Sequence, residues 1–144
     1  PLYSSAASDV YKRQKLNIIT SRRTSDKVKK ILIKKLKNIA KIWTGEGGNP
    51  YIESIQKSSF FIVTSDSTSM ISEAAVSGKP IYVYHLTFKR KSKRIENFHK
   101  EFSKLGITKN IINFNHLNDW TYDSLNESER IAIILKKRII KEKI

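Results

Sequence analysis

The segment from Thr64 to Pro80 holds the residues most suited to binding a phosphate. It continues the apolar run Phe60–Val63 and carries five hydroxyl side chains and one carboxylate in six consecutive positions. Small hydroxyl side chains let backbone N–H groups approach a phosphate, and the partial positive charge at a helix N-terminus favours an anion. The segment therefore predicts an anion-binding loop. Its six polar residues are Thr64, Ser65, Asp66, Ser67, Thr68 and Ser69.

Glu73 follows about one turn into the helix expected after this loop. Its carboxylate could accept hydrogen bonds from a pair of ribose hydroxyls, and the adjacent alanines Ala74 and Ala75 permit close packing of the helix on a sheet. A structural interpretation fits the same residues: Ser67 or Ser69 caps the helix, and Glu73 is a first-turn acid that suits the helix dipole. The sequence leaves both interpretations open.

A second candidate anion site is the run Ser21-Arg22-Arg23, placed where a strand is expected to end and a helix to begin. Two adjacent arginines supply donors that can grip a phosphate in pairs. The alternative is that Thr24 or Ser25 merely caps the helix and that both arginines are solvated.

The glycine-rich run Gly45–Gly48 precedes Asn49 and Pro50. Such loops can cradle phosphates, but the spacing of the Walker motif is absent and so is the GxGxxG fingerprint. Asn49 and Pro50 also form a standard helix start, with Asn as the N-cap and Pro at the first helical position. Asn49 could therefore bind the ligand, cap the helix, or do both.

The absence of cysteine and the spacing of the histidines exclude several kinds of site. The sequence contains no cysteine, which removes disulfides, cysteine zinc sites, iron–sulfur clusters and thiol nucleophiles. The histidines His85, His99 and His116 do not have the spacing of metal ligands, so no metal site is predicted. His85 ends an expected strand at the ligand edge, whereas His99 lies within a helix between phenylalanines and is interpreted as structural.

Strands and helices alternate along the chain, which predicts βαβ units, a parallel sheet and an α/β, Rossmann-like fold with helices on both faces. Ligands of such sheets bind beyond the carboxyl ends of the strands, where the candidate residues fall. The strands are predicted at 16–20, 42–44, 60–64, 81–84 and 111–114. The helices are predicted from 28 to 40, 50 to 58, 69 to 77, 95 to 105 and 127 to 143.

The chain has 144 residues and a net charge of +15. That charge suits nucleic acid or an anionic membrane, but the basic residues are spread along the chain and no nucleic-acid motif is present, so nucleic acid is not the favoured partner. No apolar run approaches the length of a membrane span and no secretory signal pattern is found, which favours a cytoplasmic protein.

The first 14 residues differ in composition from the rest and contain no isoleucine. Residues 1–14 are therefore predicted to be a non-native or unstructured leader. Residues 15–144 are predicted to form a single Rossmann-like domain whose N-terminal partner domain is missing.

Four separated motifs resemble the mitochondrial-fission Elm-one-like family, whose bacterial members are often labelled nucleoside-diphosphate-sugar epimerases. The resemblance covers nearly all of residues 15–143. The motifs are Ser21-Arg22-Arg23-Thr24, Gly48-Asn49-Pro50-Tyr51, Val63-Thr64-Ser65-Asp66-Ser67 through Met70-Ile71-Ser72-Glu73-Ala74, and Gly78-Lys79-Pro80.

That family is similar to the C-terminal half of GT-B glycosyltransferases and UDP-sugar 2-epimerases, which holds the nucleotide-sugar donor. The resemblance implies a nucleotide-sugar of the UDP type as substrate, and the sequence identifies no cofactor. It also implies that Glu73 binds the ribose, that Ser67, Thr68 and Ser69 face the diphosphate, and that Arg22 contacts a phosphate. The activity stays open, and this half alone is expected to be inactive, because the reaction centre would lie between two domains.

The alternative function is a non-enzymatic scaffold or membrane-surface module, which the family name suggests. The basic loop residues Arg90, Lys91, Lys93 and Arg94 would then contact anionic lipid or a partner. In that case the protein would be cytoplasmic and peripheral to the inner membrane.

Overall fold

The computed structural model describes residues 15–87, 92–113 and 116–141. The expected leader, residues 1–14, lies outside the described residues, as do Arg90 and Lys91 of the basic loop. The chain divides into two compact units, residues 1–57 (unit 1) and residues 58–144 (unit 2). The expectation of a single domain over residues 15–144 stays a prediction.

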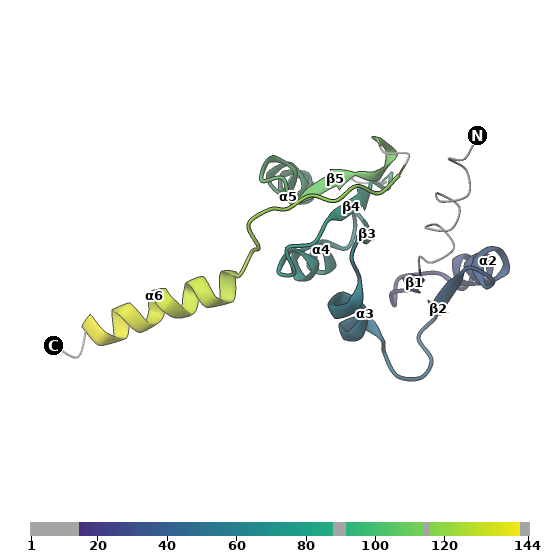
Figure 1. The fold of residues 1–144 in the computed structure, drawn as a ribbon, viewed down its shortest axis with the longest axis horizontal. Helices are drawn as coiled ribbons and strands as arrows, with labels where there is room; N and C mark the ends of the chain where they lie inside the picture. Colours follow the sequence, from purple (N-terminus) through teal and green to yellow (C-terminus); the bar gives the residue numbers. More distant parts are fainter. Residues whose placement is uncertain (1–14, 88–91, 114–115, 142–144) are drawn as a thin grey trace, which may run out of the picture. The chain divides into compact units, whose positions relative to one another are not determined.

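Unit 1 contains a parallel pair of strands, β1 and β2, joined by helix α2 (Figure 1). The helix begins at Asp26, two residues before the predicted start, and the Ser25 hydroxyl accepts a hydrogen bond from the Val28 backbone N–H at 3.4 Å. This confirms Ser25 as the N-cap. The described elements of unit 1 are β1 (Leu16–Ile19), α2 (Asp26–Leu36), β2 (Ala40–Trp43) and α3 (Tyr51–Lys57).

The predicted end of α2 is wrong. The helix ends at Leu36 instead of Ala40, and Ala40 already begins β2, which pairs it with Leu16. Apolar residues continue at helical spacing through Ile39 and Ala40, but Ala40 is paired in the sheet and Ile39 lies in the turn before it. The Ile39 N–H donates to the Leu36 carbonyl at 3.0 Å and closes the turn between helix and strand.

Unit 2 holds a three-stranded parallel sheet in the order β3-β4-β5 (Figure 1). Helix α4 joins the first two strands and α5 joins the last two, as in successive βαβ units. The parallel sheets flanked by helices confirm the predicted α/β, Rossmann-like class. The described elements of unit 2 are β3 (Phe61–Thr64), α4 (Thr68–Ala75), β4 (Ile81–Tyr84), α5 (Lys93–Lys104), β5 (Thr108–Asn110), a short 3₁₀ helix η1 (Ile111–Asn113) and α6 (Glu127–Lys141).

The last strand lies earlier than predicted. β5 spans Thr108–Asn110, and the Ile-Ile-Asn run expected to be a strand forms η1; Phe114 lies outside the described residues. The Asn110 side chain explains the change, because its Oδ1 accepts a hydrogen bond from the Ile112 N–H at 3.1 Å. That local bond curls the chain out of the sheet.

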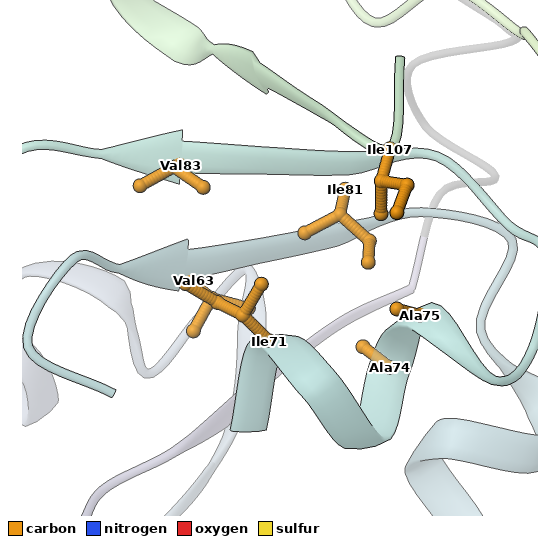
Figure 2. Close-up of a cluster of buried hydrophobic side chains, with 7 residues drawn as sticks. All are labelled: Val63, Ile71, Ala74, Ala75, Ile81, Val83 and Ile107. Carbon is orange, nitrogen blue, oxygen red and sulfur yellow. The ribbon is translucent and has the colours of Figure 1, made fainter. Parts of the chain in front are cut away.

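The core of unit 2 lies between α4 and one face of the sheet (Figure 2). Figure 2 shows the strand side chains and the α4 side chains meeting across this face, where the alanines let the helix approach closely. Phe98 and Phe102 of α5 pack against the same cluster. The cluster consists of Val63, Ile71, Ala74, Ala75, Ile81, Val83 and Ile107.

Tyr82 of β4 is buried and alternates with its core neighbours, so it points to the opposite face of the sheet. Its hydroxyl accepts a hydrogen bond from the Asn118 N–H at 2.7 Å, and Trp120 packs edge-on against its ring at 5.0 Å between centroids. The segment around these two residues thus covers β4 from the side opposite α4.

Candidate functional site

The candidate site of unit 2 begins with Ser65, directly after β3. Ser65 is buried, its N–H donates to the Tyr84 carbonyl, and its hydroxyl accepts from the Leu86 N–H, both at 3.0 Å. These bonds tie the loop after β3 to the loop after β4. The structure therefore gives Ser65 a bracing role at the carboxyl edge of the sheet.

Ser67 occupies the N-cap position of α4, as one of the two sequence interpretations predicted. Its carbonyl accepts from the Ile71 N–H at 3.1 Å, but its side chain makes no capping bond to the helix. Thr68 opens the helix and Ser69 is exposed in its first turn. Ser67, Thr68 and Ser69 therefore lie together at the start of α4, and the Ser67 hydroxyl does not cap the helix.

The two carboxylates of this segment lie in different places. Asp66 is half-buried in the turn between β3 and α4. Glu73 is exposed in the second turn of α4, which begins at Thr68 and has no acid in its first turn. The interpretation of Glu73 as a first-turn acid is therefore wrong, because the helix starts one residue before Ser69 and leaves Glu73 five positions further on.

His99 of α5 connects this loop to the neighbouring helix. Its Nε2 lies 2.8 Å from the Ser65 carbonyl, which can only accept, so Nε2 carries the hydrogen. The ring of His85 stands edge-on to His99 at 5.0 Å between centroids. Burial lowers the pKa of His85, and the nearby His99 lowers it further. The sequence placed His99 correctly in a helix but gave no signal for its contact with a residue 34 positions away.

A cavity of about 470 Å³ opens between α5 and the carboxyl ends of β4 and β5. We name it the α5 groove. It was not predicted, because lysines on a helix surface have the same pattern whether they are solvated or line a groove. Its polar lining includes His85, His99, Lys100, Ser103, Lys104 and Asn110.

Three of the four candidate residues of unit 1 lie in the turn after β1, namely Ser21, Arg22 and Arg23. The Ser21 hydroxyl accepts from the Arg23 N–H at 3.2 Å, and the Ser21 N–H donates to the Thr24 hydroxyl at 3.1 Å. These bonds shape the turn that leads into α2. Arg22 and Arg23 are both exposed in this turn, which follows the carboxyl end of β1.

Asn49 serves the helix start that its sequence position predicted. Its Oδ1 accepts a hydrogen bond from the Tyr51 N–H at 3.0 Å, at the first residue of α3. A cavity of about 170 Å³ lies nearby in unit 1, lined in part by Trp43, Gly48 and Pro50. The capping interpretation of Asn49 is confirmed.

The ten candidate residues fall into two sets. Ser21, Arg22, Arg23 and Asn49 belong to unit 1, and the six from Ser65 to Glu73 belong to unit 2. Within unit 2 the structure gathers Ser65, Asp66, Ser67 and Thr68 around the start of α4. Among the helices of residues 15–87, 92–113 and 116–141, none has the length and apolar character needed to cross a bilayer.

Two curated relatives match most of this chain. It is 32% identical over 130 residues to the Arabidopsis thaliana protein named "Mitochondrial fission protein ELM1". The aligned residues make up 86% of this chain and 29% of that relative. It is 33% identical over 146 residues to the Rickettsia prowazekii (strain Madrid E) protein named "Uncharacterized protein RP120", covering 94% and 40% respectively. The chain therefore spans well under half the length of either relative. No solved structure matches it.

The model of the family described as "Mitochondrial fission ELM1" matches residues 3–139. That range takes in both units and every candidate residue named above. It agrees with the resemblance drawn from the four motifs, and the chain belongs to the mitochondrial fission ELM1 family.

Proposed function

We propose that this chain binds a nucleotide-sugar of the UDP type, as the donor-binding half of a GT-B-like, glycosyltransferase- or epimerase-related protein. One observation carries the proposal. The loop between β3 and α4 collects hydroxyl residues at the N-terminus of a helix, at the carboxyl edge of a parallel sheet. In open α/β sheets, this is the edge at which nucleotides bind.

The chemistry follows from the helix end. Backbone N–H groups of the first turn of α4, with the hydroxyls of Thr68 and Ser69, would hold the diphosphate. They would stabilise the negative charge that develops on it as a leaving group. Glu73, exposed one turn further along, would accept hydrogen bonds from the ribose. Arg22 and Arg23 of unit 1 are proposed as further phosphate donors, and turnover would require the N-terminal partner domain.

Titration calorimetry of the full chain with UDP, UDP-N-acetylglucosamine, GDP and ADP tests this proposal. We expect the uridine nucleotides to bind, and Glu73→Gln to weaken them by roughly tenfold or more, because a hydrogen bond to a charged group contributes about 1.5–3 kcal/mol. The matched control is Glu101→Gln, an exposed glutamate of α5, which should leave the affinity unchanged. Equal affinities for wild type and Glu73→Gln would sink the site assignment.

A second candidate is attachment to an anionic membrane surface as a scaffold. Lys93 and Arg94 are exposed at the start of α5, and the basic run in the sequence extends back to Arg90 and Lys91, which lie outside the described residues. Each basic side chain near an anionic leaflet contributes about 1 kcal/mol. The name of the Arabidopsis relative, which refers to mitochondrial fission, favours testing this candidate.

Sedimentation with vesicles separates the two candidates. The membrane candidate predicts binding to vesicles of phosphatidylcholine with phosphatidylglycerol, none to phosphatidylcholine alone, and release at about 0.5 M salt, where the Debye length is only a few ångströms. The double change Lys93→Glu with Arg94→Glu should abolish this binding. The same charge change at Lys34 and Lys35 of α2 should weaken it less.

A further inference from the structure

The α5 groove has a polar lining without a carboxylate among the described residues. Lys100 and Lys104 are one helical turn apart on α5, with Ser103 between them, so the three side chains share a face of the helix. Asn110 faces them from the end of β5. Two exposed lysines, an exposed serine and an asparagine therefore line a space of about 470 Å³.

The two histidines form the end of the groove nearest β3. His99 is held by its bond to the Ser65 carbonyl, and His85 leaves β4 beside it. Burial, and then the neighbouring His99, lower the pKa of His85 below its ordinary value, so the His85 ring is mostly neutral at neutral pH without a bound anion. An anion placed there would favour the protonated ring.

Lys109 lines the groove as well, but its ammonium group is directed elsewhere. It lies 4.2 Å from the centre of the Trp120 ring, a cation–π contact. Lys109 also alternates along β5 with Asn110, which places their side chains on opposite faces. The positive charge available to a ligand in the groove therefore comes from the two α5 lysines.

We propose that the α5 groove is a second anion site, which binds a small molecule through its phosphate group. Lysine ammonium groups bind phosphate as point charges, and the Ser103 hydroxyl and Asn110 amide can donate to its oxygens. The volume falls in the range of small-molecule sites and exceeds what a lone phosphate needs. The site does not depend on the nucleotide site proposed at the start of α4, from which it differs in elements and residues.

Inorganic pyrophosphate, titrated into the full chain and followed by the ring-proton NMR signals of the three histidines, is the test. The signals of His85 and His99 should shift saturably, whereas His116, which does not line the groove, should stay in place. The double variant Lys100→Ala with Lys104→Ala should bind at least about tenfold more weakly. Lys100→Arg with Lys104→Arg retains both charges and should bind within about threefold of wild type.

The matched control is Lys34→Ala with Lys35→Ala on α2, which lowers the net charge equally and should change the affinity by less than about twofold. Equal weakening by both alanine pairs would attribute the binding to the general basicity of the chain and overturn the proposal. Unchanged His85 and His99 signals would overturn it as well, because pyrophosphate would then not bind in the α5 groove. Pyrophosphate bound at the start of α4 would not depend on Lys100 and Lys104, so the loss of binding in their alanine variant tells failure of the groove from failure of the nucleotide site.

Two further probes distinguish the source of the phosphate. Glycerol 3-phosphate represents a soluble phosphate ester, and vesicles of phosphatidylcholine with about 10% phosphatidic acid represent a lipid headgroup. A shift of the His85 signal by either probe, lost in the Lys100/Lys104 alanine variant, supports the site and names its source. If a single-stranded oligonucleotide displaces pyrophosphate equally well from the Lys100/Lys104 alanine variant and from the Lys34/Lys35 alanine variant, the proposed site is contradicted.

Discussion

The two units share a local design but differ in burial. Each has parallel strands joined by a helix, yet every buried hydrophobic residue in the described chain belongs to unit 2. In the part of unit 1 that the structure describes, helices α2 and α3 bury no residue, and Thr20 alone is buried. A third strand and a second helix on the same face give unit 2 enough surface to enclose a core, which two strands lack.

An amphipathic pattern therefore does not by itself produce a buried helix face. Helix α2 carries Val28 and Ile31 three residues apart on its apolar face, and each is 45% exposed in the described chain, while Leu32 and Leu36 of the same helix are only half-buried. Helix α4 has a similar share of apolar residues, but its Ile71 is fully buried against the sheet. The free energy gained by burial should therefore be concentrated in unit 2.

The largest expected effect is a direct test of this contrast with one isoleucine in each helix. Ile71→Ala in α4 removes a fully buried side chain and should lower the free energy of unfolding of unit 2 by about 2–5 kcal/mol. Ile31→Ala in α2 removes a side chain that is 45% exposed and should change the stability of unit 1 by less than about 1 kcal/mol. Both changes are isoleucine to alanine within a helix, so their effects on helix propensity match.

The two tryptophans let each unit be followed separately in denaturant. Trp43 lies in unit 1 and Trp120 in unit 2, so the backgrounds Trp120→Phe and Trp43→Phe each leave one reporter. Ile71→Ala should shift the Trp120 transition, and Ile31→Ala should leave the Trp43 transition almost unchanged. Comparable losses from the two substitutions would show that α2 buries its apolar face as α4 does, and the comparison between the units would fail.

The second effect concerns the opposite face of the unit 2 sheet. Tyr82→Phe removes a buried hydroxyl bonded to the Asn118 backbone and should cost about 1–2 kcal/mol. Tyr84→Phe, two residues along the same strand, changes an exposed tyrosine and should have almost no effect. Thermal unfolding monitored at Trp120 measures both. If the two variants melt together, the hydrogen bond between the Tyr82 hydroxyl and the Asn118 backbone adds nothing to the stability of unit 2.

The sequence predicted the elements of unit 2 best where strong apolar runs are bounded by local stop signals. Gly78, whose φ of +69° favours glycine, ends the α4 region, and β4 begins three residues later, as expected. Two predicted boundaries are wrong, the end of a helix at Ala40 and the start of a strand at Ile111. At Ala40 the pairing with Leu16 ends the helical pattern, and at Ile111 a local bond to the Asn110 side chain replaces the expected strand. Local spacing cannot weigh such competing partners.

The candidate site shows the same division. The hydroxyl loop at the start of α4 could be located from sequence, because a strand, a polar turn and a helix follow one another along the chain. The contact of His99 with Ser65 and the convergence of Lys104 with Asn110 could not, because they join elements that only the folded sheet brings together.

The stability of unit 2 should also depend weakly on pH through His85. Because burial, and then His99, lower the pKa of His85 below its ordinary value of 6.5, the unfolded chain binds more protons than the folded one just below that pH. The stability of unit 2 should therefore fall as the pH drops below 6.5, until the folded pKa is passed. His85 is exposed, so the effect is small, and His85→Gln should flatten it.

Unit 1 should not share this dependence. All three histidines of the chain lie after residue 84, so none belongs to unit 1. Its shifted carboxyl group is that of Glu53, whose pKa is lowered below 4.5 by its bond to Lys57, so the stability it contributes is lost only below that value. Between about pH 5 and 7 the Trp120 transition should move and the Trp43 transition should not. A Trp43 transition that follows the same pH profile would mean that the units unfold as one, since a proton bound at His85 can destabilise unit 1 only through cooperative unfolding.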